Sequence, residues 1–250
     1  MITVIGTVRN RATDVERWLE SLAPHDLEVI LVDYGSDDDL DGVLTRTRCP
    51  VKVIHLDMFP ADGYPEAHLK NIGIRASTRP IVACTNVDVA YDPEFWPSIG
   101  RCAGQGTLVQ VVRKNAPPGV IVKPDASYNE NGKSFSMTND LHPLQFGPGT
   151  PIVAGGDMQA MHRDDWEMFR GYDERLYGWG GVDSDLMVRA LLYGYSLVVL
   201  GHKITKYVHQ WHAFDLEKQL SDAKRNHQII MDGINCGTVA RNTETWGGMP

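Results

Sequence analysis

The amino-acid sequence predicts an α/β protein built on a mixed, mostly parallel sheet that is flanked by helices. The first observation is that short runs of β-branched and other apolar residues alternate with segments of helical periodicity along the N-terminal part. The second is that polar, turn-rich loops directly follow two of these runs, as they do at the carboxyl edge of a parallel sheet. The third is that 250 residues, 42% of them hydrophobic and 22% charged, suit a soluble domain with its own core.

The N-terminal part is expected to contain four strands and two main helices. Thr13 is expected to cap the first helix, with Glu16 three residues later and apolar residues at helical spacing behind it. The second helix is expected over Glu66–Ser77. The strands are expected at Ile2–Val8, Leu27–Val32, Val51–Leu56 and Pro80–Thr85.

The pattern is weaker in the second half of the chain. A strand over Thr107–Val112 is followed by residues 115–149, which are rich in Pro, Gly, Asn and Ser. Long loops of this kind are commonly functional. Regular structure is then expected at Ile152–Met161, in helices over Arg163–Phe169 and Asp185–Tyr193, in a strand over Ser196–Leu200 and in an amphipathic helix over Leu216–Met231.

Charge and cysteine content exclude several classes of protein. With 24 Lys and Arg against 32 Asp and Glu, the net charge of −8 argues against non-specific binding to nucleic acid. The four cysteines form no CxxC pair, so we expect neither a zinc knuckle nor a disulfide framework, and reduced thiols indicate a cytoplasmic protein. No stretch approaches the roughly 20 apolar residues that a membrane-spanning helix needs, so no membrane segment is expected in this chain.

Acidic and amide side chains follow two of the expected strands. Asp33 comes directly after the second strand, where its carboxylate could accept a hydrogen bond from a base or a ribose; formation of a turn is the alternative. Asn86 and Asp88 follow the fourth strand on the same side of an extended segment. Their oxygens suit Mg²⁺ or Mn²⁺, although turn chemistry is the better explanation of the pair taken alone.

Two later segments carry further candidates. In Leu176–Asp185 (LYGWGGVDSD) the glycines allow close approach of a ligand, and Asp183 is the candidate general base, with capping of the next helix as the alternative for it and for Asp185. His209 and His212 are three residues apart, and an imidazole could complete an oxygen-rich metal site or be structural. Arg9 and Arg11 follow the first strand and could bind phosphate or a base, or lie on the surface.

The order of these segments resembles that of the GT-A glycosyltransferases. Val8–Arg11 is similar to the uridine-binding loop of the β-galactosyltransferases, and Val32–Ser36 to the VDxGS motif of bacterial family 2 enzymes. The remaining similar segments are Lys70–Gly73 (helix under the donor), Thr85–Asp88 (DxD), Gly155–Asp157 (glycine pair), Gly178–Asp185 (WGGED) and His209–His212 (HxxH).

The resemblance implies a role for each matching residue. Asp183 is the expected catalytic base, and Asp88 and His212 are the expected ligands of Mn²⁺ or Mg²⁺. The expected donor-binding residues are Thr7, Arg9, Arg11, Asp33, Lys70, Asn71, Asn86 and Val87. The expected acceptor-binding residues are Gly156, Trp179, Gly181 and Asp185.

The activity that the resemblance implies is metal-dependent transfer of a sugar from a nucleotide sugar, expected to be a UDP-sugar, to a hydroxyl of a glycan or other acceptor with inversion. Asn86 replaces the first acid of DxD, and Val182 replaces an acid that holds the acceptor, so the acceptor identity does not follow. A retaining transferase, a nucleotidyltransferase and an inactive sugar-nucleotide or glycan-binding module are the alternatives.

The expected organisation is one GT-A domain over residues 1–232. Residues 1–100 form its nucleotide-sugar half and residues 101–232 its acceptor and metal half. The tail, residues 233–250, and the loop over residues 115–149 are expected to order as lids when the donor binds, because closure excludes water.

Overall fold

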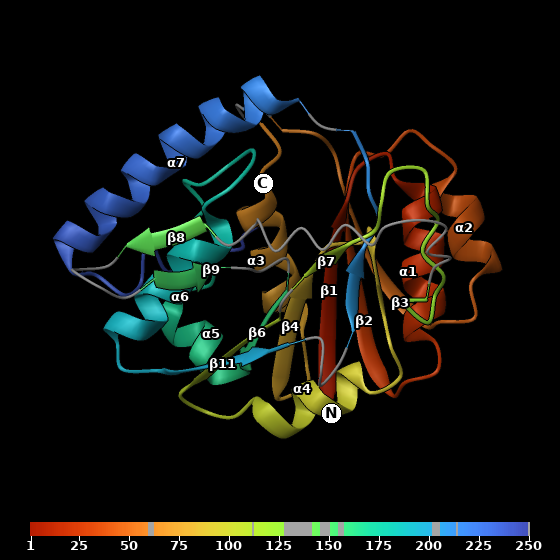
Figure 1. Ribbon diagram of the computed structural model, residues 1–250, viewed down its shortest axis with the longest axis horizontal. Coiled ribbons are helices and arrows are strands. Elements are labelled where there is room, and N and C mark those ends of the chain that lie inside the picture. Colours follow the sequence, from red (N-terminus) through yellow and green to blue (C-terminus); the bar gives the residue numbers. More distant parts are fainter. Residues whose placement is uncertain are drawn as a thin grey trace.

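The computed structural model describes residues 1–59, 63–111, 113–127, 158–201, 206–213 and 215–249, together with the backbone of residues 142–145 and 151–154. Within these residues the helices are α1 (Ala12–Leu22), α2 (Leu40–Arg46), α3 (Glu66–Ala76), α4 (Phe95–Cys102), α5 (Arg163–Phe169), α6 (Val182–Leu192) and α7 (Leu216–Cys236). Figure 1 shows them around a central twisted sheet.

The central sheet has seven strands in the order β11-β6-β10-β4-β1-β2-β3. Parallel pairing joins β1 to its two neighbours and β11 to β6, whereas β10 runs antiparallel between β4 and β6. The strands are β1 (Ile2–Val8), β2 (Leu27–Tyr34), β3 (Val51–Leu56), β4 (Ile81–Thr85), β6 (Thr107–Val111), β10 (Gln159–His162) and β11 (Ser196–Leu200). The predicted mixed, mostly parallel sheet is confirmed.

Two smaller sheets accompany the central one. β12 (Tyr207–His209) lies between β5 (Val89–Tyr91) and β7 (Lys114–Asn115), and β8 (His142–Gln145) forms an antiparallel pair with β9 (Pro151–Ala154). The sheet of β5, β12 and β7 matters for function because β5 begins four residues after β4 ends. It therefore continues from the carboxyl edge of the central sheet.

The two faces of the central sheet bury separate hydrophobic clusters. Side chains of α1, α2 and α4, such as Trp18 and Trp96, pack on one face. Side chains of α3, α5 and α6, such as Trp166 and Leu186, pack on the other. This layering follows from alternation along the central strand, because Val4 belongs to the first cluster and the next residue, Ile5, to the second.

The structure corrects several predicted boundaries. α1 begins at Ala12 rather than behind Thr13, and the Ala12 amide donates to Asp38 Oδ2 at 2.7 Å, so a distant loop supplies the acceptor that Thr13 was expected to offer. α6 begins at Val182, three residues earlier than predicted, because Gly181 adopts a positive φ of 95° at the N-cap. The short helices α2 and α4 were not predicted.

The C-terminal segment, which was expected to order as a lid when the donor binds, is packed against the body of the protein in this structure. α7 continues to Cys236, and the side chain of Trp246 is only 3% exposed. The Asn242 side chain donates to the carbonyls of Arg170 and Tyr172, and Arg241 approaches Asp185 at 3.8 Å. The end of the chain accordingly lies beside α3 (Figure 1).

Part of the second expected lid is also packed. Ala116, Val122 and Ala126 are buried with residues of β5 and β12, so the start of the 115–149 segment belongs to a small core. Residues 128–141 and 146–150 lie outside the described residues. In the part of the chain that the structure describes, no helix has both the length and the apolar character needed to cross a bilayer.

A buried ion pair within α6 also contacts the C-terminal segment. Asp185 and Arg189 are both 1% exposed and lie 2.7 Å apart, and Arg189 also donates to the carbonyls of Phe169, Gly171 and Val239. Burial raises the pKa of Asp185, while Arg189 and Arg241 oppose that shift. The neighbouring guanidinium groups are therefore what keep this carboxylate compatible with burial.

We expect Asp185→Asn to lower the free energy of unfolding by about 3–5 kcal/mol, because it leaves the buried Arg189 without its counter-ion. Urea unfolding followed by circular dichroism measures the change. Asp232→Asn, on the exposed face of α7, is the matched control and should change stability by less than about 0.5 kcal/mol. Equal effects of the two substitutions would contradict the buried pair.

Candidate active site

The pairing of two short strands brings an aspartate and two histidines together. Asp88 lies just before β5, and His209, the last residue of β12, is paired with Val89. Asp88 Oδ2 lies 3.3 Å from His209 Nε2 and 3.2 Å from His212 Nε2. The backbone also links the segments, since the Gln210 amide donates to the Asp88 carbonyl at 2.8 Å.

Asp88, His209 and His212 have the geometry of a metal-binding group. One ligand atom from each of them lies within 4.8 Å of the others. Asp88 Oδ1 and His209 Nδ1 are buried without a hydrogen-bond partner among the described residues, which is costly unless a ligand satisfies them. Two imidazoles and one carboxylate suit Mn²⁺ better than Mg²⁺, which prefers oxygen ligands. His209 was not among the predicted ligands, although its spacing from His212 was the available signal.

Electrostatics keep Asp88 ionised. Burial alone would raise the pKa of Asp88, but His209, His212 and Arg11 outweigh burial and hold it well below its usual range. The hydrogen bond to Asp88 in turn raises the pKa of His212, against the effect of burial. A negative ligand is therefore ready at this position.

Arg11 lies at the same group rather than at a separate nucleotide site. Its Nη1 atom is 3.3 Å from Asp88 Oδ2 and 3.4 Å from Asp14 Oδ2. Arg9, from the same loop, lies over the ring of Tyr34 at 5.9 Å from the centroid. The two predicted donor-binding arginines thus lie in different places, Arg11 beside the candidate metal group and Arg9 over the last residue of β2.

Asp33 is buried at the end of β2 with both carboxylate oxygens engaged. Oδ1 accepts a hydrogen bond from the Ser36 amide at 3.1 Å, and Oδ2 lies 3.1 Å from His55 Nδ1. His55 was missed by sequence reasoning because its position follows from register: Asp33 and His55 are directly paired between β2 and β3. Asn10 joins the loops that follow β1 and β2. Its backbone N–H donates to Ser36 Oγ, and its side-chain Oδ1 accepts from the backbone N–H of Asp37.

Asp183 lies in the first turn of α6 above a buried lysine. Lys70, on α3, is fully buried, with Nζ 2.6 Å from Glu66 Oε1 and 3.9 Å from Asp183 Oδ1. Burial opposes the charge on Lys70, but Glu66 and Asp183 outweigh burial and raise its pKa above the usual value. Gln159 donates to the Asp183 carbonyl at 2.8 Å. Lys70 was predicted to bind the donor; the structure places it beneath Asp183 instead.

The other predicted residues divide between the interior and the surface. Asn71 is buried and holds the Tyr172 backbone through its amide and carbonyl groups, so its side chain supports a loop. Thr7 and Val87 are buried and Asn86 is half-buried at the carboxyl edge. Asp185, predicted to bind the acceptor, is instead in the buried pair with Arg189.

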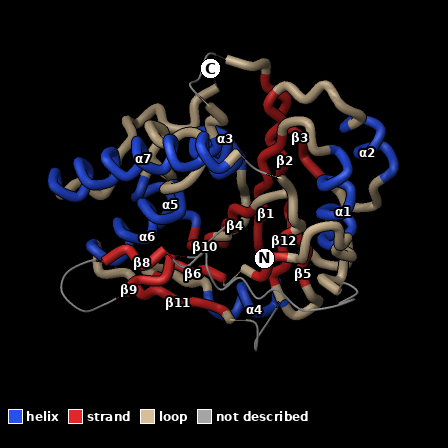
Figure 2. Tube along the Cα trace, turned by 45° about the horizontal axis from the view of Figure 1, so that its top comes forward, coloured by secondary structure: helices blue, strands red, loops and turns tan. Residues whose placement is uncertain are grey.

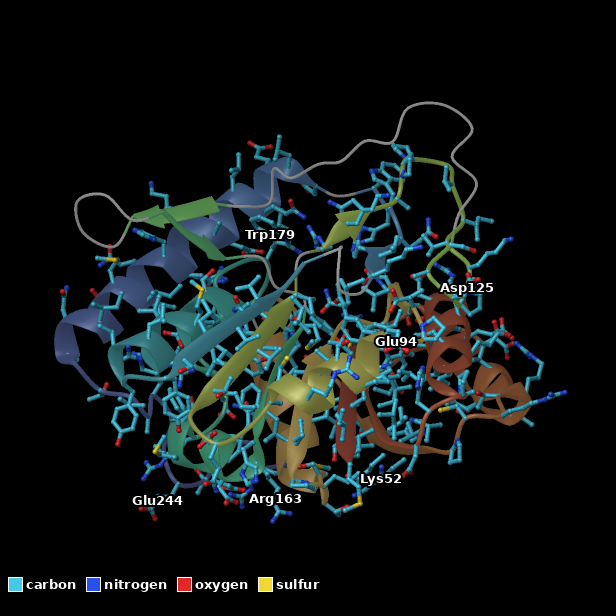
Figure 3. All side chains as sticks on the ribbon, turned by 60° about the horizontal axis from the view of Figure 1, so that its bottom comes forward. Lys52, Glu94, Asp125, Arg163, Trp179 and Glu244 are labelled. Atoms are coloured by element: carbon cyan, nitrogen blue, oxygen red, sulfur yellow. The ribbon has the colours of Figure 1, made fainter. Side chains whose placement is uncertain are left out.

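Trp179 is the most exposed of the predicted acceptor residues that the structure describes. It is 44% exposed and lies in the loop that leads to α6 (Figure 3). Gly181 caps that helix, and Gly156 lies outside the described residues. In Figure 2, β5 and β12 lie on the side of β1 where α1 lies, and α6 and α7 lie on the other, so the elements that carry the candidate residues flank β1 on both sides.

Together, these features define a GT-A glycosyltransferase fold. Residues 3–167 match the family described as Glycosyl transferase family 2, which covers more than half of the chain, and residues 147–213 match the family described as N-terminal domain of galactosyltransferase. The chain belongs to glycosyl transferase family 2. The predicted resemblance to family 2 and to the galactosyltransferase region is confirmed.

Solved structures agree on the fold. The *Staphylococcus aureus* TarS fragment 1–349 has a TM-score of 0.64 and 17% identity, over 98% of this chain and 68% of that one. The same fragment in complex with UDP-GlcNAc has a TM-score of 0.63 and 16% identity, over 98% and 69%.

A curated relative is more similar in sequence. Validoxylamine A glucosyltransferase of Streptomyces hygroscopicus subsp. limoneus is 24% identical over an alignment of 240 residues, and the match covers 80% of this chain. The match covers 49% of the relative, so this chain spans about half the length of the curated relative it matches.

We expect Lys70→Met to lower the free energy of unfolding at pH 7 by about 3–5 kcal/mol, because Glu66 and Asp183 lose their buried counter-ion. The raised pKa of Lys70 means that its stabilisation is complete below the ordinary lysine value of 10.5 and is lost as pH rises towards the folded-state pKa. Urea unfolding at pH 7, 9 and 11 should therefore show a constant difference from wild type that shrinks only at the highest pH. Lys224→Met, on the exposed side of α7, should have little effect throughout.

Proposed function

We propose that this chain transfers a hexosyl or N-acetylhexosaminyl group from a UDP-sugar to an acceptor hydroxyl, with a divalent metal and with inversion at the anomeric carbon. The observation that carries the proposal is that a group able to hold a metal ion, Asp88 with His209 and His212, and a candidate base, Asp183 in the first turn of α6, both lie at the carboxyl edge of a family 2 sheet. Ligands of open α/β sheets bind at that edge.

The nucleotide is proposed to bind over the loops that follow β1 and β2. Asp33 offers a buried acceptor to a base N–H group, and His55 beside it offers a ring nitrogen. A carboxylate acceptor suits uracil, which presents an N–H group between two carbonyls. The solved TarS complexes with UDP-GlcNAc and UDP support a uridine nucleotide for this fold.

Asp88, His209 and His212 are proposed to hold Mn²⁺. When bound there, the ion supplies positive charge that neutralises the departing diphosphate. Arg11 contacts Asp88 and adds a second cation beside the same position. Asn86 removes one carboxylate from the DxD pattern, and His209 supplies a further ligand atom in compensation.

Asp183 is proposed to act as the general base. Lys70 lies 3.9 Å from its carboxylate, which favours the ionised form that the reaction needs. Asp183 accepts the proton of the acceptor hydroxyl, the acceptor oxygen forms a bond to the anomeric carbon, and the bond from that carbon to the phosphate oxygen breaks. One in-line displacement of this kind inverts the anomeric configuration.

The acceptor is proposed to be a glycan or another hydroxyl compound that lies against Trp179. An exposed indole face suits the flat apolar side of a sugar ring. The named activity of the curated relative, a glucosyltransferase, supports a hexose as the transferred group.

The first expected outcome concerns the metal. Mn²⁺ at about 100 times its dissociation constant should stabilise the protein by about 2.7 kcal/mol and raise the melting temperature by roughly 5–10 °C. His209→Ala should abolish that rise, because it removes one of three ligands. Differential scanning calorimetry measures the rise in melting temperature in wild type and in the variant. His227→Ala, at an exposed position of α7, is the control. A full rise in the His209 variant would remove this residue from the metal group.

The second expected outcome concerns the base. Asp183→Asn should lower Mn²⁺-dependent release of UDP from UDP-glucose or UDP-GlcNAc by about 100- to 10,000-fold, because the attacking oxygen keeps its proton. UDP affinity, measured by calorimetry, should stay within about twofold of wild type. Near wild-type turnover in Asp183→Asn would refute the assignment.

The third expected outcome concerns stereochemistry. In the absence of an acceptor, water takes its place, so proton NMR of the first-released sugar reports the displacement directly. UDP-glucose carries an α linkage, and inversion therefore releases β-glucose before mutarotation. Initial release of the α anomer would instead establish the retaining alternative.

A further inference from the structure

Three side chains on one face of helix α7 form hydrogen bonds with the loop that precedes α6. Asp222 Oδ2 accepts a hydrogen bond from the Trp179 amide at 3.1 Å. Asn226 Nδ2 donates to the carbonyl of Gly180 at 2.6 Å and lies 3.1 Å from that of Tyr177. Arg225 donates to the Tyr177 carbonyl and lies over the Tyr177 ring, 3.6 Å from its centroid.

Two of these side chains are buried, and the third, Arg225, is partly exposed and pairs with one of them. Asn226 is 0% exposed and Asp222 is 6% exposed, and Arg225 pairs with Asp222 at 2.9 Å. A buried amide or carboxylate that binds backbone groups is costly to remove, since its partners then lose their hydrogen bonds. The hydrogen bonds from these side chains therefore restrict the conformation of the loop.

The loop itself has little intrinsic stiffness. Gly178, Gly180 and Gly181 all have positive φ angles, of 68°, 82° and 95°. Glycine reaches this region freely but loses the most conformational entropy on ordering. A Cβ atom on Gly178 would lie 2.2 Å from Asp222 Oδ2, so loop and helix are in close contact there. External hydrogen bonds are therefore what select one conformation.

The loop is held from its other side as well. The Gly178 amide donates to the Tyr64 carbonyl, ahead of α3, at 2.9 Å. Directly after this point come the exposed Trp179, the N-cap Gly181 and, in the first turn of α6, Asp183. The position of the indole and the direction from which α6 starts both follow from the conformation of this short loop.

We propose that Asp222, Arg225 and Asn226 of α7 are positioning residues of the transfer site, which fix Trp179 and Asp183 by clamping the Tyr177–Gly181 loop. The effect of this clamp on the rate of transfer rests on the proposed function, whereas the contacts that make up the clamp do not. α7 thus belongs to the acceptor side of the site through its contacts with this loop.

The first test needs no substrate. The protein is labelled with 5-fluorotryptophan, and the Trp179 resonance is assigned by its loss in Trp179→Phe. We expect Asn226→Ala to shift or broaden the Trp179 signal and to leave that of the buried Trp166 unchanged. Gln228→Ala, an amide on the exposed side of the same helix, is the matched control and should leave both signals as in wild type.

A second variant keeps the test decisive if Asn226→Ala does not fold. Arg225→Lys retains the charge beside Asp222 but loses the stacking on Tyr177 and should also perturb the Trp179 signal. An unchanged Trp179 resonance in the folded variants would overturn the clamp.

The kinetic test separates positioning from donor binding. In Mn²⁺-dependent hydrolysis of the UDP-sugar, Asn226→Ala should lower kcat about tenfold, the equivalent of one buried hydrogen bond, with the donor KM within about twofold of wild type. A changed KM with unchanged kcat would overturn the positioning role. A perturbed Trp179 signal together with a wild type that releases no UDP from any UDP-sugar would refute the proposed function and leave the clamp in place.

Discussion

Parallel pairing of β1 with β2 and β4 is the constraint on which the rest of the site depends. It sets the carboxyl ends of the three strands at one edge of the sheet, so the loops after them meet there. Asp33 and the segment that ends at Asp88 reach that edge for this reason alone. The second half of the chain then completes the edge, because β10 enters antiparallel to β4 and leads on through α5 to the loop before α6.

Buried charges explain much of the remaining organisation. Each of three buried ionic groups has at least one partner that is distant in sequence: Asp88 has His209, His212 and Arg11, Lys70 has Asp183 besides Glu66 one helical turn away, and Asp185 has Arg241 besides Arg189 one helical turn away. An unpaired charge in such surroundings is strongly unfavourable, so these pairs restrict how the elements can pack. Some of the acidic side chains of the chain therefore lie at the proposed site, and others lie in buried ion pairs beneath it.

The last part of the chain acts as a brace. α7 holds the loop before α6, and the C-terminal segment holds the turn after α5 through Asn242 and the start of α6 through Arg241. Both contacts lie on the face of the sheet where α3, α5 and α6 pack. The acceptor side of the proposed site is thus supported from behind, whereas the side formed by β5 and β12 is supported by strand pairing.

The sequence by itself determined the α/β class, the principal strands, the order of the motifs and the edge at which Asp33 and Asp88 would lie. These features follow from local periodicity and from chain order, which a sequence carries directly. Tertiary structure alone decided that His55 pairs with Asp33, that Lys70 turns inward to Asp183, that Arg241 approaches the buried Asp185, and that Asp38 rather than Thr13 serves the start of α1. The reason is that the partner of a buried polar group is chosen by strand register and helix packing across long separations, and no local pattern of residues records that choice.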